Sequence, residues 1–157
     1  MHVIKESNYP LKILKMKKQK ILVLCTGNSC RSQMADGFLK HYAKVKNKNV
    51  EIYSAGVETH GVNPLATKVM LEKEIDISNN TSDLVDAYLN LGITHLISVC
   101  DHAIESCPVF PEKVEHTHHT FSDPAKASGT DDEILNSFRN TRDEIHTFCL
   151  NYLKGKF

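Results

Sequence analysis

Short apolar runs alternate with helix-like stripes along this chain of 157 residues. Residues 20–24 form an Ile/Leu/Val run that stops at a cluster of Gly, Asn and Ser, a pattern typical of a buried strand that feeds a loop. Residues 50–54 and 94–100 also have strand character, and residues 114–120 form a polar strand suited to a sheet edge. The pattern therefore predicts four strands.

Helical segments follow the predicted strands. Residues 32–43 place apolar side chains at helical spacing, and Pro64 suits the start of a second helix. A third helix is predicted over residues 83–89 with Ser82 as its N-cap, and a long C-terminal helix begins near Thr130. This alternation predicts an α/β fold, a single-domain three-layer sandwich with about four parallel strands and helices on both faces.

Reactive residue types follow the predicted strands. Cys25 ends the first strand, Cys100 ends the third, and Asp123 comes after the fourth. Sites in parallel α/β sheets form at the carboxyl ends of the strands. These three side chains are therefore expected at the same edge of the sheet, which is the main structural argument for chemistry.

The segment from Cys25 to Ser32 has the pattern Cys-x5-Arg between a strand and a helix. Its backbone N–H groups can wrap a tetrahedral oxyanion, helped by the positive end of the following helix. Gly27 and Asn28 tolerate left-handed backbone angles, and Arg31 can clamp two oxygens. The predicted oxyanion-binding residues are Thr26, Gly27, Asn28, Ser29, Cys30, Arg31 and Ser32.

The same dipoles favour a thiolate at Cys25, and Ser32 lies close enough in sequence to hydrogen-bond it. Cys25 is therefore the predicted nucleophile. The alternative is a buried strand-end cysteine with Arg31 as an ordinary helix-start charge. Gly and Asn inside the loop, with a strand before it and a helix after it, favour the functional interpretation.

Composition limits where this chemistry takes place. Lys+Arg and Asp+Glu balance at 19 each, so no global field indicates nucleic acid or an anionic membrane as a partner. Five cysteines, an odd number without an export signal, favour a reducing compartment and a cytoplasmic location. Residues 1–19 are rich in lysine and are predicted to be an N-terminal arm, either disordered or a start-site artefact, ahead of a domain at 20–157.

Several motifs together carry a resemblance to a known family. Residues 25–37, CTGNSCRSQMADG, are similar to the phosphate loop and first helix of thioredoxin-coupled arsenate reductases, which share their fold with low-molecular-weight protein tyrosine phosphatases. The similarity continues through YSAGVETHGVNP at 53–64 and IDISNNTSDL at 75–84. It also includes the Cys100/Cys107 pair followed by a proline, and Asp123 followed by another.

The resemblance implies reduction of arsenate to arsenite in arsenic detoxification. The residues matching Cys25, Cys100 and Cys107 would form a disulfide relay, which thioredoxin reduces, and Asp123 would be the general acid. Ala125 follows the Asp-Pro turn, where many tyrosine phosphatases of this fold carry an aromatic residue that contacts the substrate ring. This difference favours a small inorganic oxyanion, with some phosphatase activity remaining.

Other interpretations stay open at this point. A low-molecular-weight phosphatase is the first alternative, and a non-catalytic oxyanion-binding module is the second. Cys100 taken alone is equally well a core cysteine, and Cys107 an incidental surface thiol. A glutaredoxin/glutathione system is the alternative reductant to thioredoxin.

Weaker signals concern other cysteines, a histidine group and a cation. Cys30 is expected to pack behind the loop and Cys149 in the core, and the histidines at 116, 118 and 119 to lie on an exposed strand. No organic cofactor is expected. Some relatives bind potassium beside the loop, and the matching positions here are Asn28, Asp36, Ser54, Thr81 and Asp83. Asp36 stands where a longer Glu is expected.

Overall fold

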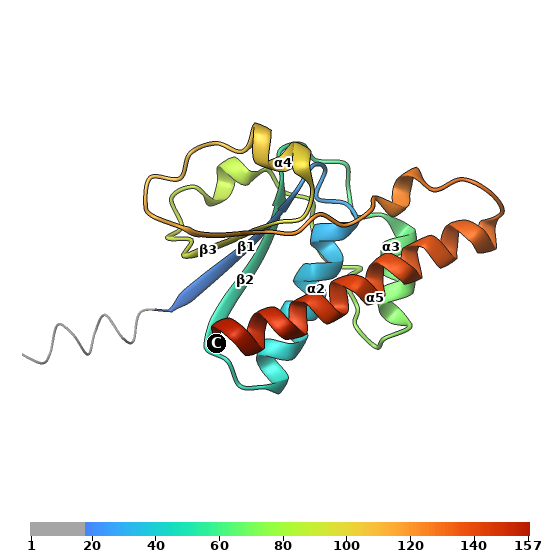
Figure 1. The fold of residues 1–157 in the computed structure, drawn as a ribbon, viewed down its shortest axis with the longest axis horizontal. Coiled ribbons are helices and arrows are strands. Elements are labelled where there is room, and N and C mark those ends of the chain that lie inside the picture. The colour runs from blue at the N-terminus through green and yellow to red at the C-terminus, as the bar shows by residue number, and fades with distance from the viewer. Residues whose placement is uncertain (1–17) are drawn as a thin grey trace, which may run out of the picture.

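The computed structural model describes residues 18–157 (Figure 1). The arm expected over residues 1–19 lies almost wholly outside this range. Its last residue, Gln19, already belongs to the first strand. None of the helices within the described range is long and apolar enough to cross a membrane.

The sheet contains four strands, β1 (Gln19–Cys25), β2 (Val50–Gly56), β3 (His95–Ser98) and β4 (Glu115–His118). All neighbouring strands are parallel, which confirms the predicted sheet of about four parallel strands. Their order in the sheet is β2-β1-β3-β4. The apolar run of β1 is fully buried from Ile21 to Leu24, as expected for a central strand covered on both faces. Polar β4 occupies an edge.

The helices α2 (Arg31–Val45), α3 (Pro64–Leu71) and α5 (Asp131–Lys156) pack together on one face of the sheet (Figure 1). The connections from β2 to β3 and from β3 to β4 cross the sheet in the direction opposite to the β1–β2 connection. Right-handed crossovers therefore bring η1 (Val85–Tyr88) and α4 (Asp101–Ser106) to the other face. A short turn, η2 (Pro124–Lys126), precedes α5.

Residues 83–89 differ from the predicted helix. Only the 3-10 helix η1 forms there, because the backbone of Asp83 is already bonded: its C=O accepts from Gly56 N at 2.8 Å, and its N–H donates to Asn28 Oδ1 at 2.8 Å. The predicted N-cap Ser82 instead donates its hydroxyl to the carbonyl of Gly27 at 3.0 Å. This segment therefore braces the loop after β1 rather than starting a helix.

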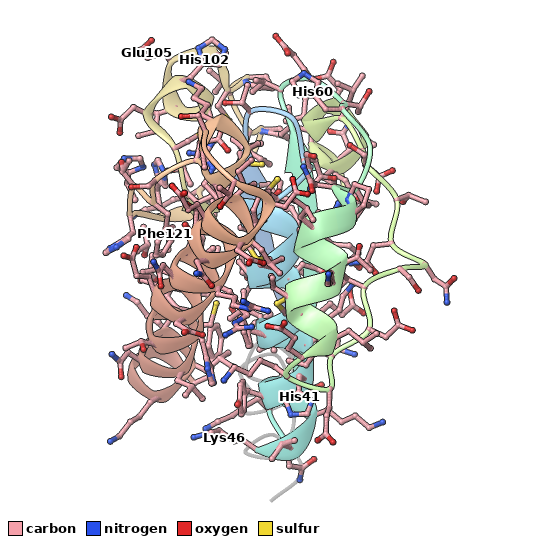
Figure 2. The ribbon with its side chains drawn as sticks, turned by 90° about the vertical axis from the view of Figure 1, so that its right-hand side faces the viewer. His41, Lys46, His60, His102, Glu105 and Phe121 are labelled. Atoms are coloured by element: carbon pink, nitrogen blue, oxygen red, sulfur yellow. The ribbon has the colours of Figure 1, made fainter. Side chains whose placement is uncertain are left out.

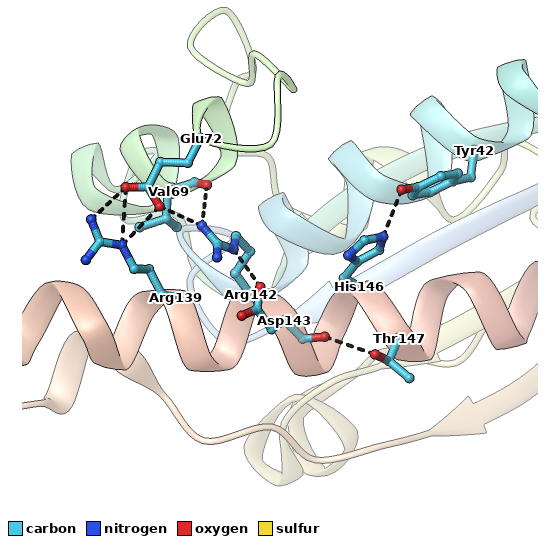
Figure 3. A network of polar contacts seen from close by, with 8 residues as sticks. All are labelled: Tyr42, Val69, Glu72, Arg139, Arg142, Asp143, His146 and Thr147. Atoms are coloured by element: carbon cyan, nitrogen blue, oxygen red, sulfur yellow. Dashed lines mark hydrogen bonds and ion pairs between the residues drawn. The ribbon is translucent and has the colours of Figure 1, made fainter.

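Helix α5 begins as predicted, with Thr130 Oγ1 accepting from Glu133 N. Figure 3 shows how its middle is fixed to the other helices. The buried Arg142 donates to the Val69 carbonyl and to Glu72, and Arg139 also binds Glu72. Hydrogen bonds from Arg139 lower the pKa of the Glu72 carboxyl to about 2.

Candidate active site

The sulfur of Cys25 lies at the end of β1, where the side chain is 3% exposed. Ser32 Oγ is 2.8 Å from Cys25 Sγ, and Asn28 Nδ2 donates to the same Ser32 oxygen at 2.8 Å. The Ser32 oxygen accepts from Asn28, and its own hydroxyl proton is free to donate to the sulfur. A hydroxyl within hydrogen-bonding distance of a cysteine sulfur can orient that sulfur for nucleophilic attack.

Gly27 and Asn28, both expected to adopt left-handed backbone angles, differ in the structure. Asn28 has φ +48°, so it alone of the pair occupies the left-handed region, and it is completely buried. Gly27 lies directly against the exposed ring of His60, which a Cβ at position 27 would displace. The sequence-based expectation of left-handed angles at both positions was therefore wrong for Gly27.

Arg31 and Asp123 face one another at the rim of the loop. Arg31 Nη1 donates to the Phe121 carbonyl at 3.1 Å, and Nη2 lies 3.5 Å from Asp123 Oδ2. The other oxygen of Asp123 accepts from Ala125 N and so caps η2. A guanidinium and a carboxyl at one rim can respectively bind an oxyanion and protonate a departing oxygen.

A pocket of about 400 Å³ opens over the loop. Its lining includes Cys25, Arg31 and Asp123, together with three side chains without a role in the sequence analysis: His60, His102 and Lys126. Figure 2 shows His60 and His102 at the same end of the molecule. These three residues place nitrogen-bearing side chains around the pocket. The sequence signals for two of them were the ETHG segment, which contains His60, and the lysine shortly after the Asp-Pro turn, which is Lys126.

The predicted second thiol lies beside the loop and the third lies farther out. Cys100 Sγ is 3.1 Å from Oγ1 of Thr26, the residue that follows Cys25 in sequence. Cys107 follows α4, is half-buried, and contacts the Pro108 carbonyl at 3.4 Å. Burial raises the pKa of the Cys107 thiol. The segment between the two thiols is the short helix α4.

The remaining two thiols, Cys30 and Cys149, are buried, and burial favours their protonated form. All five cysteines fall within residues 18–157 and are free. Burial raises the pKa of the Cys30 thiol to about 12, so Cys30 can serve the loop through its backbone while its sulfur stays protonated. Cys149 is fully buried against α2, and burial raises its pKa as well.

A second pocket, of about 290 Å³, lies behind the loop and gathers four of the five residues expected to hold a cation. These are Asp36, Ser54, Thr81 and Asp83. The fifth, Asn28, is not in this lining, and its Oδ1 already accepts from Asp83 N. Asp36 is 2% exposed and its Oδ1 has no hydrogen-bond partner, whereas its Oδ2 is 3.1 Å from Lys40 Nζ.

The donor set of this second pocket fits a cation. Two carboxylates and two hydroxyl-bearing residues offer hard oxygen ligands, and one buried carboxylate oxygen still lacks a partner. Burial raises the pKa of Asp36, because the carboxylate is poorly solvated there. The Lys40 ammonium neutralises part of that charge from the solvent side.

The chain is similar to known proteins in both sequence and fold. The sequence model of the family "Low molecular weight phosphotyrosine protein phosphatase" matches residues 20–155. An arsenate reductase of Halalkalibacterium halodurans is 50% identical over 130 residues, which cover 83% of this chain and 91% of the relative. A solved arsenate reductase in its phosphate-binding state superposes with a TM-score of 0.64 at 29% identity, covering 87% of this chain and 98% of the other.

A likeness in fold alone extends further. The low molecular weight protein tyrosine phosphatase of T. tengcongensis has a TM-score of 0.76 at 22% identity, covering 88% of this chain and 99% of that structure.

Proposed function

Because the chain belongs to the low-molecular-weight phosphotyrosine protein phosphatase family, we propose that it turns the family's thiol chemistry to reduction and converts arsenate to arsenite. The observation that carries the proposal is the convergence of Cys25, its loop and a second thiol at one sheet edge, with Cys100 Sγ 3.1 Å from Thr26 Oγ1. The pocket wall after the Asp-Pro turn supports a small substrate, because Ala125 and Lys126 stand there.

The reaction begins with attack of the Cys25 thiolate on arsenic. Arg31 and the loop N–H groups hold the arsenate oxygens, and Asp123 protonates the oxygen that leaves as water. The product is a Cys25–arsenic adduct in which arsenic is still pentavalent. Thiolate reactivity at this step rests on the hydrogen bond from Ser32.

Reduction occurs when the Cys100 thiolate attacks the sulfur of Cys25. The S–S bond forms, the S–As bond breaks, and the bonding pair stays on arsenic, which leaves as trivalent arsenite. Cys107 then attacks Cys100, releases the Cys25 thiolate and leaves a Cys100–Cys107 disulfide. Two thiols have been oxidised and one arsenic has gained two electrons.

A dithiol protein must then reduce Cys100–Cys107, and we assign this step to thioredoxin, with a glutaredoxin/glutathione system as the alternative. We place the reaction in the cytoplasm, where such reductants keep thiols reduced.

The decisive experiment measures arsenite production with thioredoxin, thioredoxin reductase and NADPH. The wild type should turn over many times, whereas Cys107→Ser should stop after one turnover with Cys25 and Cys100 joined. Cys149→Ala is the matched control, because it removes a cysteine distant from the relay, and it should keep multiple turnover.

Three outcomes would contradict the proposal in different ways. A wild type that makes arsenite only once, or not at all, removes the reductase assignment. Full turnover by Cys107→Ser removes the relay but keeps the reductase. Brisk hydrolysis of phosphotyrosine without arsenate reduction establishes the phosphatase instead.

The pocket around Asp36 is the proposed site of a potassium ion. Asp36, Ser54, Thr81 and Asp83 would hold it, and its charge would stabilise the brace that Asp83 forms with Asn28. The test is thermal unfolding in potassium chloride against choline chloride of the same concentration. Binding to the folded state alone should raise the melting temperature in potassium, and equal melting temperatures would remove the site.

A further inference from the structure

A chain of hydrogen bonds links the polar edge strand to the helix between the two outer thiols. Ser98 Oγ lies 2.7 Å from His116 Nε2 and 2.7 Å from His118 Nδ1. His118 Nε2 in turn lies 2.9 Å from Asp101 Oδ1, to which Thr120 Oγ1 donates at 2.7 Å. The five residues Ser98, Asp101, His116, His118 and Thr120 are named the α4 clasp.

One proton arrangement satisfies every member of the clasp. The Asp101 carboxylate only accepts, so His118 Nε2–H donates to it and His118 Nδ1 accepts the Ser98 hydroxyl proton. His116 Nε2–H then donates to Ser98 Oγ. Burial lowers the pKa of His116, which agrees with a neutral ring there.

The order Ser–His–Asp is also that of a hydrolase triad, but Ser98 is completely buried at the centre of the sheet, where no substrate can reach it. The clasp instead ends at Asp101, the first residue of α4 and the neighbour of Cys100. Hydrogen bonds from Thr120 and His118 lower the pKa of Asp101, so its charged form is the one that is held.

Helix α4 needs such a tether. It contains six residues, its N-cap Cys100 provides no side-chain hydrogen bond, and helices this short are unstable alone. Along an intact helix the Cα atoms of Cys100 and Cys107 would be separated by about 10 Å, from a rise of 1.5 Å per residue. A disulfide requires less than about 7 Å. Joining the two sulfurs therefore requires α4 to distort.

We propose that the α4 clasp holds the Cys100–Cys107 pair in its dithiol form and thereby sets the reduction potential of the disulfide, with Asp101, His118 and Thr120 as positioning residues. This inference rests on the relay proposed above. A clasp that exists only with α4 intact stabilises the dithiol relative to the disulfide. A stabilised dithiol makes the disulfide easier to reduce. The clasp thus slows closure of the disulfide and favours its reduction by the partner.

The test uses the Cys25→Ser background, in which Cys100 and Cys107 can pair only with each other among the relay thiols. Equilibration with reduced and oxidised dithiothreitol measures the constant for transfer of two electrons between the dithiol pairs. Asp101→Asn should shift this equilibrium toward the protein disulfide by about threefold, the size expected for a solvent-exposed charge pair. That shift lowers the potential by about 14 mV, since tenfold corresponds to about 30 mV.

Two further variants separate the clasp from the charge of the helix. Thr120→Val leaves the sequence and the charge of α4 unchanged but removes the hydroxyl that donates to Asp101, and it should shift the equilibrium in the same direction as Asp101→Asn. Glu105→Gln removes an exposed negative charge from the same helix (Figure 2) and should leave it unchanged. The double variant of Asp101 and Thr120 should shift it by less than the product of the single effects, because the two share one hydrogen bond.

Different results would contradict the clasp and the relay. If Asp101→Asn alone shifts the equilibrium, or if Glu105→Gln shifts it equally, the effect belongs to helix charge and the clasp is overturned. Unchanged potentials in both clasp variants overturn it while leaving the relay intact. If the background protein never forms a Cys100–Cys107 disulfide, both the relay and the clasp are wrong.

Discussion

Replacing Ser32 by alanine tests how Cys25 is activated. Ser32 Oγ accepts a hydrogen bond from Asn28 Nδ2 and can donate its own hydroxyl to Cys25 Sγ, with both contacts at 2.8 Å and all three residues buried. A hydrogen bond to a charged group is worth about 1.5–3 kcal/mol. With about 1.4 kcal/mol per factor of ten, Ser32→Ala should slow thiolate-dependent reaction at neutral pH about tenfold to a hundredfold.

The assay is alkylation of Cys25 by iodoacetamide, followed by residue-resolved mass spectrometry across a range of pH. The deficit of Ser32→Ala should shrink as the pH rises, because hydroxide then generates the thiolate without help. Ser29→Ala is the matched control: it removes a serine hydroxyl from the same loop whose contact is with Cys30 Sγ at 3.9 Å.

Ser32→Thr retains the hydroxyl and should restore most of the reactivity. The reasoning is refuted if Ser32→Ala and Ser29→Ala alkylate alike at neutral pH. It is also refuted if the Ser32→Ala deficit is the same at every pH, since a general loss of structure rather than a missing proton donor would then be the cause.

Two further predictions concern stability. Burial raises the pKa of Asp36, so its contribution favours the folded state below the unfolded pKa and is lost as pH rises through the folded value. Asp36→Asn should therefore flatten the fall in urea stability from mildly acidic to neutral pH when potassium is absent, and an unchanged slope would contradict this. Arg142→Met leaves the Val69 carbonyl without its donor and should cost about 2 kcal/mol in urea unfolding, from the penalty for an unpaired buried acceptor. The more exposed Arg139→Met should cost less, and equal losses would contradict the role given to burial.

Periodicity sufficed for the sheet because each strand is a distinct apolar or alternating run between polar breaks. It failed at residues 83–89, where the carbonyl and amide of Asp83 bond to Gly56 and Asn28. Those partners are 27 and 55 residues away in sequence, so no local pattern reveals that the backbone of Asp83 forms these bonds. Helix propensity applies to a backbone whose N–H and C=O groups are available for helical hydrogen bonds, and those of Asp83 are bonded elsewhere.

Some residues of the site could be predicted from the sequence and others could not. Cys25, Arg31 and Ser32 follow from one local motif, and the structure brings them together. The part of Asn28 was harder to see, because its donation to Ser32 depends on a left-handed turn that the residue type permits but does not require. His60 reaches the pocket from the loop after β2, His102 from α4 and Lys126 from η2, a convergence that only tertiary structure decides.

The position of Cys107 has a consequence for inhibition. It lies beyond α4 and is not among the residues that line the oxyanion pocket. In the proposed cycle, the disulfide is transferred from Cys25–Cys100 to Cys100–Cys107. The reducing partner therefore reacts at Cys107, outside the pocket that binds the oxyanion, and the two do not compete for the same site. Phosphate should then behave as a competitive inhibitor toward arsenate while leaving the rate of re-reduction untouched, and the enzyme can be regenerated with its pocket already filled.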